Sequence, residues 1–222
     1  MIPKIIHQTW KDFDPPADIY FPEWLESWKK DYPDWEHLLW SDQANESLIM
    51  DEYPEFYGVY QSLNKGVERS DLARILYMHK FGGVYVDLDF VSLRPLDPVL
   101  NALPAHIIVG EMAKQEQPVP NAFLASPKGD EFWLRVAIDG MVDFRENDVD
   151  KTESIFGADR LNWALEAYRP NVTRLASDCI YPFKWGNQLD QLKLQGADKT
   201  DLDYLRSLYP NSFAVTFWSH NW

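Results

Sequence analysis

The sequence is poor in cysteine and in positive charge. Its one cysteine, Cys179, cannot form a disulfide within the chain, which leaves the redox compartment open with a lean towards the cytosol. With 21 Lys and Arg against 35 Asp and Glu, the net charge is −14. Such a surface repels a nucleic-acid backbone, so binding of DNA or RNA is not expected. It also repels a nucleoside diphosphate, and a ligand of that kind would need a metal ion and a few local cations.

Long apolar runs and a cationic leader are also absent. Residues 1–7 run directly into a strand-like pattern, so we expect neither a signal peptide nor a transmembrane segment, and a cytoplasmic protein. A peripheral position at the inner face of a membrane stays open as an alternative. No repeat, low-complexity tract or interdomain linker interrupts the 222 residues, which predicts one domain over residues 1–222.

Short strand and helix patterns alternate along the chain. They predict strands over residues 4–10, 36–40, 84–89, 91–96, 107–110, 122–126, 180–183 and 213–218. They predict helices over residues 22–30, 43–50 with Asp42 as its cap, 55–64, 66–80, 129–145, 158–168 and 202–208. A turn or short helix starts at Asp97, and residues 146–153 are expected to form a loop. This order is typical of an α/β fold with a mixed, mainly parallel central sheet.

Aromatic residues make up 15% of the chain and include ten Trp. Most aromatic area in a folded protein lies in the core, so the core is the first interpretation for any one of them. Proteins that handle carbohydrates also use such rings as flat platforms with a polar edge, and both interpretations stay open here.

The most informative stretch spans residues 68–90. An apolar-striped helix ends at Gly82-Gly83, and a strand that starts at Val84 then carries Asp87 and Asp89. Two residues apart on a strand, these carboxylates leave the same face, and like charges this close are costly unless a cation lies beside them. Oxygen ligands of this kind suit Mg²⁺ or Mn²⁺ holding phosphate. A solvated strand end is the ordinary interpretation of Asp-x-Asp, but the apolar strand before it favours a metal site.

Asp71 and Arg74 lie three apart on the helix before this strand and therefore face the same way. An exposed salt bridge is the usual meaning of such a pair. The functional alternative is that Asp71 bonds sugar hydroxyls while Arg74 supplies local positive charge through its fixed donors.

Three segments resemble one known family. The run R-S-D-L-A-R, seven further residues and G-G-V-Y-V-D-L-D, residues 69–89, is similar to the DXD region of glycosyltransferase family 32 and to the catalytic core of the large glucosylating bacterial toxins. The opening I-P-K-I-I-H-Q-T-W and the closing A-V-T-F-W-S-H-N-W resemble the first and last strands of that family. The resemblance implies a GT-A fold, a nucleotide-sugar donor, Mn²⁺ or Mg²⁺, and retention of the anomeric configuration.

The resemblance also implies roles for particular residues. Trp10 would stack on the nucleobase, and Asp71 and Arg74 would contact the donor sugar. Asp87 would bind ribose and sugar hydroxyls, directly or through a metal-bound water, and Asp89 would bind the metal. Tyr85 matches an aromatic of the motif and would shape the pocket, although Trp10 and Tyr85 could both be ordinary core residues.

The chain departs from the family pattern near its end. Many relatives carry a histidine where this sequence has Thr216, and a histidine follows four residues later, at His220. Either His220 takes over as a metal or diphosphate contact, or Asp89, phosphate and water hold the metal alone. In the first case the segment that carries Trp218, Ser219, His220 and Trp222 would lie over the diphosphate.

A further candidate is Asp159, in the place where relatives carry a Thr-Gly-Pro-like turn. Capping of the helix that starts at residue 158 is its ordinary interpretation. The alternative is that this helix start lines the acceptor side.

Taken together, the sequence predicts a metal-dependent, retaining glycosyltransferase that moves a sugar from a UDP- or GDP-sugar to a glycan, lipid-linked or polysaccharide acceptor. Surface polysaccharide synthesis is the expected setting, by analogy with the family. Two alternatives remain: an inactive module that binds nucleotide sugars or glycans, and an Asp-x-Asp phosphatase.

Overall fold

A computed structural model describes residues 1–16, 22–112, 119–146, 152–182 and 200–218. In this part of the chain a six-stranded sheet has the order β2-β1-β3-β6-β5-β7, and β4 and β8 form a two-stranded sheet. The strands are β1 (Ile5–Thr9), β2 (Glu36–Trp40), β3 (Gly83–Val86), β4 (Phe90–Ser92), β5 (Ile107–Gly110), β6 (Phe123–Ser126), β7 (Val172–Leu175) and β8 (Ala214–Thr216). The helices are α1 (Pro22–Asp31), α2 (Asp42–Glu52), α3 (Pro54–Ser62), α4 (Gly66–Lys80), α5 (Asp97–Ala102), α6 (Glu131–Glu146), α7 (Thr152–Ile155), α8 (Ala158–Tyr168), α9 (Ser177–Ile180) and α11 (Leu202–Leu208).

The sheet is mixed, as predicted. Strand β1 runs parallel to β2 and β3, and β5 runs parallel to β7. Strand β6 is antiparallel to both β3 and β5 and so joins the two parallel parts. The predicted α/β class with a mainly parallel central sheet is therefore confirmed.

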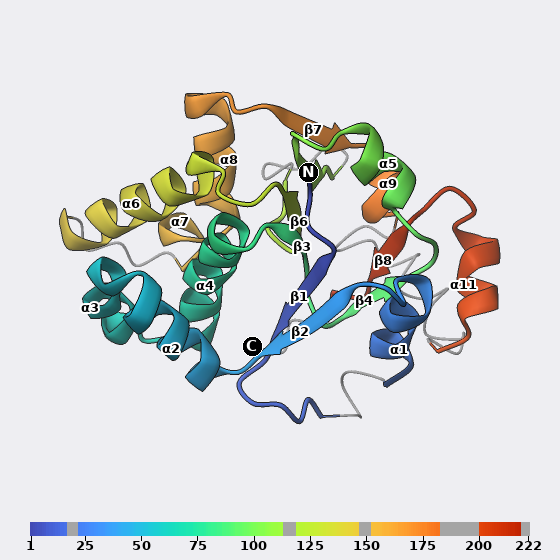
Figure 1. Ribbon diagram of the computed structural model, residues 1–222, viewed down its shortest axis with the longest axis horizontal. Helices are drawn as coiled ribbons and strands as arrows, with labels where there is room; N and C mark the ends of the chain where they lie inside the picture. Colours follow the sequence, from blue (N-terminus) through green and yellow to red (C-terminus); the bar gives the residue numbers. More distant parts are fainter. Residues whose placement is uncertain (17–21, 113–118, 147–151, 183–199, 219–222) are drawn as a thin grey trace.

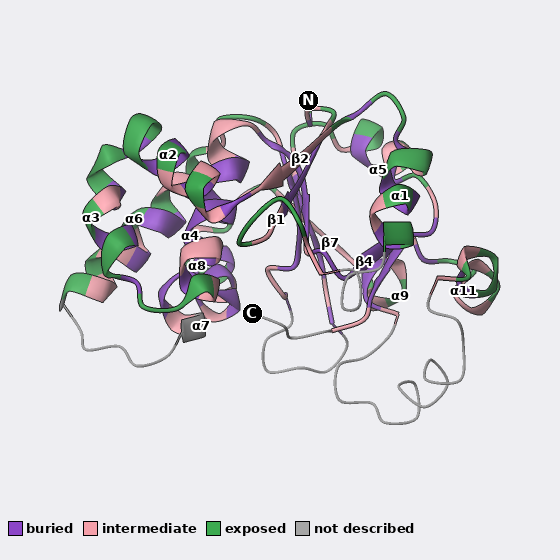
Figure 2. Cartoon of the chain, turned by 90° about the horizontal axis from the view of Figure 1, so that it is seen from below, coloured by how far each residue is buried: buried purple, intermediate pink, exposed green. Residues whose placement is uncertain are grey.

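Helices cover both faces of this sheet (Figures 1 and 2). One face packs against α2, α3, α4, α6, α7 and α8, and the other against α1, α5, α9 and the small sheet. Side chains alternate along a strand, so successive residues of β3 point to opposite faces of the sheet. Tyr85 packs in the core under α4 and α6, the first core, whereas Val84 and Val86 pack in the second core, on the face covered by α1 and α5. Burial on both faces explains the continuous apolar pattern of this strand.

Two glycines carry the chain from α4 into β3. Gly82 and Gly83 have φ angles of 65° and 92°, in the left-handed region that glycine adopts without strain. A Cβ atom on Gly83 would lie 2.6 Å from the carbonyl oxygen of Ile5. The double glycine therefore lets helix and strand follow one another with β3 packed directly beside β1.

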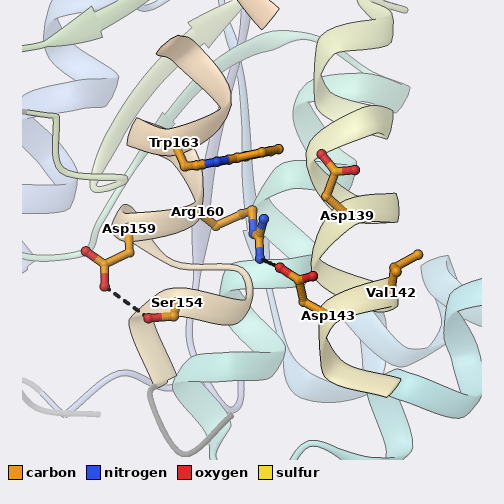
Figure 3. A pocket seen from close by; sticks show the side chains of 7 residues that line it. All are labelled: Asp139, Val142, Asp143, Ser154, Asp159, Arg160 and Trp163. Atoms are coloured by element: carbon orange, nitrogen blue, oxygen red, sulfur yellow. Dashed lines mark hydrogen bonds and ion pairs between the residues drawn. The ribbon is translucent and has the colours of Figure 1, made fainter. Parts of the chain in front are cut away.

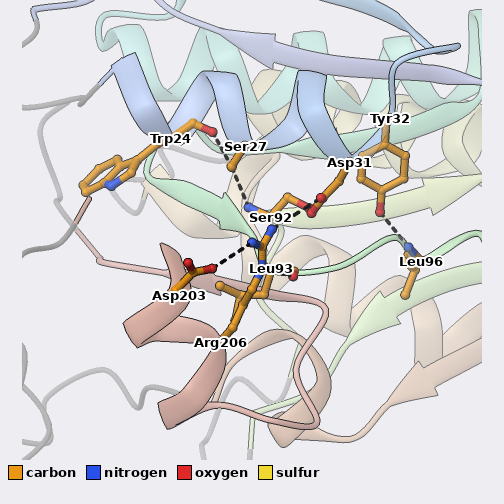
Figure 4. Close-up of polar contacts among 9 residues, drawn as sticks. All are labelled: Trp24, Ser27, Asp31, Tyr32, Ser92, Leu93, Leu96, Asp203 and Arg206. Atoms are coloured by element: carbon orange, nitrogen blue, oxygen red, sulfur yellow. Dashed lines mark hydrogen bonds and ion pairs between the residues drawn. The ribbon is translucent and has the colours of Figure 1, made fainter. Parts of the chain in front are cut away.

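Strand β4 is fixed by polar contacts with two helices (Figure 4). The Ser92 amide donates to Ser27 Oγ at 2.9 Å, and the Ser92 hydroxyl donates to Asp31 at 2.7 Å. Arg206 Nε donates to the Leu93 carbonyl at 2.7 Å. These bonds hold the strand that follows Asp89 between α1 and α11.

Three local predictions were wrong, and one strand was missed. Residues 180–183 were expected as a strand, but Ile180 ends the short helix α9, and Phe183 lies outside the described residues. Ser41, not Asp42, caps α2, because its side chain accepts the Ala44 amide at 3.1 Å. The short helix α7 begins within the expected loop 146–153, of which 147–151 are not described, and extends beyond it to Ile155. Strand β7 was not predicted at all.

Several element boundaries differ by one to three residues from those expected, and the strands on either side of the two aspartates illustrate this. Strand β3 ends at Val86, three residues earlier than the predicted 84–89, and the predicted strand 91–96 is the short β4. Among the described residues, no helix is both long and apolar enough to span a membrane.

His7 is a buried histidine held in one neutral form. Trp40 Nε1 donates to His7 Nδ1 at 3.1 Å, so the ring proton is on Nε2, which donates to the Gly82 carbonyl at 2.9 Å. Burial lowers the pKa of His7 from 6.5 to about 4, and the bond to Gly82 opposes this shift. The ring therefore ties β1, β2 and the glycine turn together only while it is neutral.

We predict that His7 makes the protein less stable in acid. The folded-state pKa is below the unfolded one, so between pH 6.5 and pH 4 the unfolded chain binds the extra proton and stability falls as the pH falls. The full effect is about 3 kcal/mol, from about 1.4 kcal/mol per pKa unit. The measurement compares urea unfolding of the wild type and His7→Gln across this range. Parallel pH curves for the two proteins would contradict the assignment.

Candidate functional site

Asp87, Leu88 and Asp89 form a turn between the two sheets. The Asp87 amide donates to the Ala122 carbonyl at 3.0 Å, and the Phe90 amide donates to the Asp87 carbonyl at 3.2 Å, which closes the turn before β4. The expectation that both aspartates leave the same face of one strand is therefore wrong. The chain leaves the large sheet at Asp87 and joins the small one after Asp89, so each carboxylate has its own neighbours.

The Asp87 carboxylate is bound to helix α4 through Arg74. Arg74 Nη1 donates to Asp87 Oδ1 at 3.2 Å and to the Asn121 carbonyl at 3.1 Å, and Nη2 lies 3.3 Å from Asp71 Oδ1. The guanidinium carbon lies 4.7 Å from the centre of the Tyr85 ring. Arg74 is 1% exposed and Asp71 4%, so this is not the exposed salt bridge that the spacing usually indicates.

Two further side chains complete this cluster. Tyr85 donates its hydroxyl proton to Asp87 Oδ1 at 2.6 Å, and Asn121 Nδ2 donates to Asp71 Oδ1 at 2.9 Å. Tyr85 was singled out in the sequence, whereas Asn121 was missed. The Asn121 loop is held by Asn162 of α8, which exchanges two bonds with the backbone of Val119. No sequence pattern distinguishes an asparagine such as Asn121 from other polar loop residues, so its bond to Asp71 could not be predicted.

The Asp87 carboxyl is less acidic than an ordinary aspartate. Burial raises its pKa from 3.8 to about 6, Arg74 and the Tyr85 hydroxyl lower it, and Asp89 and Asp71 raise it further. Two carboxylates near one another and partly out of water thus resist full ionisation. A cation beside them would relieve that cost.

Asp89 is bound to the small sheet instead. The Thr216 hydroxyl donates to Asp89 Oδ1 at 3.0 Å and accepts the Trp218 amide at 3.2 Å. The Phe217 amide donates to the Asp89 carbonyl at 3.1 Å. Thr216, at the position where the sequence departs from its relatives, therefore fixes the second aspartate of the turn and the segment after β8.

Two of the predicted aromatic residues pack against the same hydrophobic cluster, to which Leu88 of the turn belongs. Trp10, just after β1, and Trp218 both pack against the cluster that contains Leu88 and Val215. Trp218 also stacks on Tyr181, with ring centres 5.4 Å apart. The remaining two tail candidates, His220 and Trp222, lie outside the described residues.

The oxygen ligands at this turn suit a hard divalent cation. Asp87 and Asp89 can offer carboxylate oxygens, and the described residues contain no group of three or more potential metal-binding side chains. Two carboxylates are sufficient for Mg²⁺ or Mn²⁺ when substrate phosphates and water supply the other ligands. The residues present thus fit the predicted ion. The role of His220 stays a prediction.

A separate hollow of about 420 Å³ lies between α6, α7 and α8 (Figure 3). Carboxylates and the 51% exposed Trp163 line it, together with Arg160, which pairs with Asp143. Asp159 also lines it and accepts a bond from Ser154 at 3.1 Å. Asp159 does not cap α8, since Gly157 occupies that position without a side-chain bond, so the capping prediction was wrong. An acceptor role for this helix start stays a prediction.

Comparison with known proteins supports the predicted resemblance. Residues 20–106 match the family described as "Glycosyltransferase sugar-binding region containing DXD motif". The inositol phosphoceramide mannosyltransferase 3 of Schizosaccharomyces pombe is 36% identical over 140 residues, which are 61% of this chain and 36% of that protein. A mannosyl phosphorylinositol ceramide synthase of Saccharomyces cerevisiae is 39% identical over 110 residues, 48% of this chain and 27% of that protein. The chain thus spans about a third of the length of these curated relatives.

Solved structures show the fold. The PaToxG glycosyltransferase superposes with a TM-score of 0.61 at 14% identity, over 96% of this chain and 89% of that one. The glycosyltransferase GlyE of Streptococcus pneumoniae has a TM-score of 0.56 at 10% identity, over all of this chain and 56% of that one. The predicted GT-A fold is confirmed.

We predict that Arg74→Met destabilises the protein by about 3–5 kcal/mol, because it leaves the buried carboxylate of Asp71 and the partly buried carboxylate of Asp87 without their cation. Urea unfolding at pH 7 measures the loss. The control is Arg135→Met, since Arg135 is an exposed residue of α6, and a change within about 0.5 kcal/mol is expected there. Equal losses for the two variants would contradict the role of Arg74.

We predict that Thr216→Val frees the segment after β8. Loss of the hydroxyl should cost about 1–3 kcal/mol, because the Asp89 carboxylate and the Trp218 amide each lose a partner. Hydrogen exchange at the Trp218 amide should become faster in this variant. Thr216→Ser keeps the hydroxyl and should keep that amide protected. Unchanged exchange in Thr216→Val would show that the bond is not formed in solution.

Proposed function

We propose that this chain, whose residues 20–106 carry the DXD-containing sugar-binding region of a glycosyltransferase family, is an active transferase that uses a UDP- or GDP-sugar. One observation carries the proposal: in a GT-A fold, the Asp87–Asp89 turn lies between the two sheets, with one carboxylate fixed by α4 and the other by β8. In α/β sheets ligands bind beyond the carboxyl ends of strands, which is where this turn follows β3.

Asp87 and Asp89 would hold a divalent cation, Mn²⁺ or Mg²⁺, and when bound the ion would neutralise the charge that develops on the leaving diphosphate. Arg74 sets the direction of the Asp87 carboxylate and keeps Asp71 in place. Asp71 would accept hydrogen bonds from hydroxyls of the donor sugar. Trp10 and Trp218, which pack against the hydrophobic cluster that contains Leu88, would supply flat apolar area for the base and the ribose.

We propose transfer on one face of the sugar, with retention. Arg74 holds Asp71 and Asp87, and Thr216 bonds Asp89, so none of these carboxylates is an obvious nucleophile. The bond between the sugar carbon and the phosphate oxygen would break as the acceptor oxygen bonds to the same face. The acceptor proton would pass to the departing diphosphate.

The names of the relatives suggest which substrates to try first. Two of them are named for mannose transfer to inositol phosphoceramide or for making the mannosylated product. We therefore propose a hexose, with mannose as the first candidate, and an acceptor that is a glycan, a polysaccharide or a lipid-linked alcohol.

The test is a donor panel with Mn²⁺, read by release of nucleoside diphosphate and by mass spectrometry of the acceptor. We expect one UDP- or GDP-sugar to be turned over, and Asp89→Asn to lower the rate by at least about 100-fold, which corresponds to several kcal/mol of charge stabilisation. Asp203→Asn is the control, because the Asp203 side chain is 95% exposed on α11.

The other outcomes each identify an alternative. Release of inorganic phosphate from phosphomonoesters would indicate a phosphatase. Binding of nucleotide sugars without turnover would indicate an inactive module, and full activity of Asp89→Asn without added metal would exclude the proposed role of this turn.

A further inference from the structure

Tyr181 is a buried tyrosine at the centre of the second core, directly after α9. It is 1% exposed, and its ring stacks on Trp218 and meets Phe90 edge-on with centres 5.9 Å apart. Gly110 at the end of β5 makes room for it, since a Cβ atom there would lie 2.6 Å from Tyr181 Cε2. The Tyr181 ring is thus closely packed between Trp218, Phe90 and Gly110.

The two rings that enclose Tyr181 belong to the segments that hold the Asp87–Asp89 turn. Phe90 directly follows Asp89, and Trp218 donates its amide to Thr216, which bonds Asp89. Asp87, Arg74 and Asp89 are also the charged side chains that act electrostatically on the tyrosine hydroxyl. Tyr181 therefore lies at the candidate donor site, although no part of the sequence analysis pointed to it.

The hydroxyl of Tyr181 is buried, and in the described part of the chain no group accepts a hydrogen bond from it; the nearby backbone amide of Phe123 can only donate towards its oxygen. Other buried tyrosines differ: Tyr32 accepts the Leu96 amide at 2.7 Å, Tyr77 donates to Asn45, and Tyr85 donates to Asp87. An unsatisfied buried hydroxyl is costly and calls for an explanation such as a missing ligand.

The hydroxyl can act only as a neutral donor or acceptor here. Burial, together with the charges of Asp87 and Asp89, raises the pKa of Tyr181 well above its ordinary value, while the backbone amide of Phe123 and the charge of Arg74 oppose this. The proton therefore stays on the oxygen at neutral pH, available to an oxygen acceptor that enters the site.

We propose that Tyr181 is a donor-binding residue, whose hydroxyl donates a hydrogen bond to an oxygen of the nucleotide sugar, in the diphosphate or in the sugar. This rests on the function proposed above. Oxygens of the diphosphate and of the sugar are hydrogen-bond acceptors, and among the described residues no group accepts a bond from this hydroxyl. Because the oxygen is covered, the donor can reach it only when a neighbouring side chain moves, and Trp218, partly exposed and stacked on the ring, is the one expected to move.

The test is Tyr181→Phe, measured for stability and for ligand binding. Removing a hydroxyl without an acceptor should leave the Tm unchanged or raise it, whereas loss of a hydroxyl that donates to the scaffold would lower it. Calorimetric titration with GDP and UDP in MnCl₂, and then with GDP-mannose and UDP-glucose, should show about tenfold weaker binding of the ligand that the wild type prefers.

Tyr32→Phe is the matched control, because it removes a tyrosine hydroxyl that accepts a backbone amide. It should lower the Tm and leave the affinity unchanged. Weaker binding of the free diphosphate by Tyr181→Phe assigns the bond to phosphate, and weaker binding of the nucleotide sugar alone assigns it to the sugar.

Two results would overturn the proposal. Equal affinities of wild type and Tyr181→Phe for every probe would show that the hydroxyl serves water or the scaffold, with the transferase function intact. A wild-type protein that binds none of the four probes with Mn²⁺ would refute the proposed function itself, and the role of Tyr181 with it.

Discussion

The buried guanidinium of Arg74 is the interaction on which the rest of the site depends. It lies between Asp71 and Asp87, bonds the Asn121 carbonyl and rests over the Tyr85 ring. A buried charge is tolerated only when it is paired and hydrogen-bonded. Loss of any one of these contacts would therefore leave the buried guanidinium incompletely paired. The arrangement joins α4 to the end of β3 and to the loop before β6, and it fixes the first carboxylate of the Asp87–Asp89 turn.

The second carboxylate is fixed independently. Asp89 bonds Thr216 of β8, so the turn connects the large sheet to the small one, and the contacts of Ser92 with Ser27 and Asp31 secure the strand that follows. Two carboxylates held in this way would make a prepared site for the proposed divalent ion, because folding has already met the cost of bringing them together. Tyr181 lies near the same turn, and no group among the described residues accepts a hydrogen bond from its hydroxyl. The two carboxylates of the site are thus held by hydrogen bonds, whereas the Tyr181 hydroxyl has no acceptor among the described residues.

Much of this could be predicted where local pattern decides. The strand 36–40 and the helices at residues 66–80 and 158–168 were predicted with the bounds observed, since apolar periodicity and glycine or proline signals agree there. Predictions failed where a short apolar run is compatible with either a strand or a helix, as at Ile180. They also failed where two neighbouring polar residues could each cap one helix, as with Ser41 and Asp42. Strand β7 is only partly buried at the sheet edge, so it lacks the apolar alternation by which strands are recognised.

The sequence by itself determined which chemical groups are available and which of them are close along the chain. The three-residue spacing of Asp71 and Arg74, the glycine pair and the two aspartates of the turn are local features, and together with the resemblance they predicted the candidate donor site. Only the tertiary structure decided that Arg74 is buried, that Thr216 bonds an aspartate 127 positions away, and that Asn121 and Tyr181 belong to the same place. The physical reason is that burial and hydrogen bonding between distant segments depend on how the two sheets pack, and no spacing along the chain records that packing.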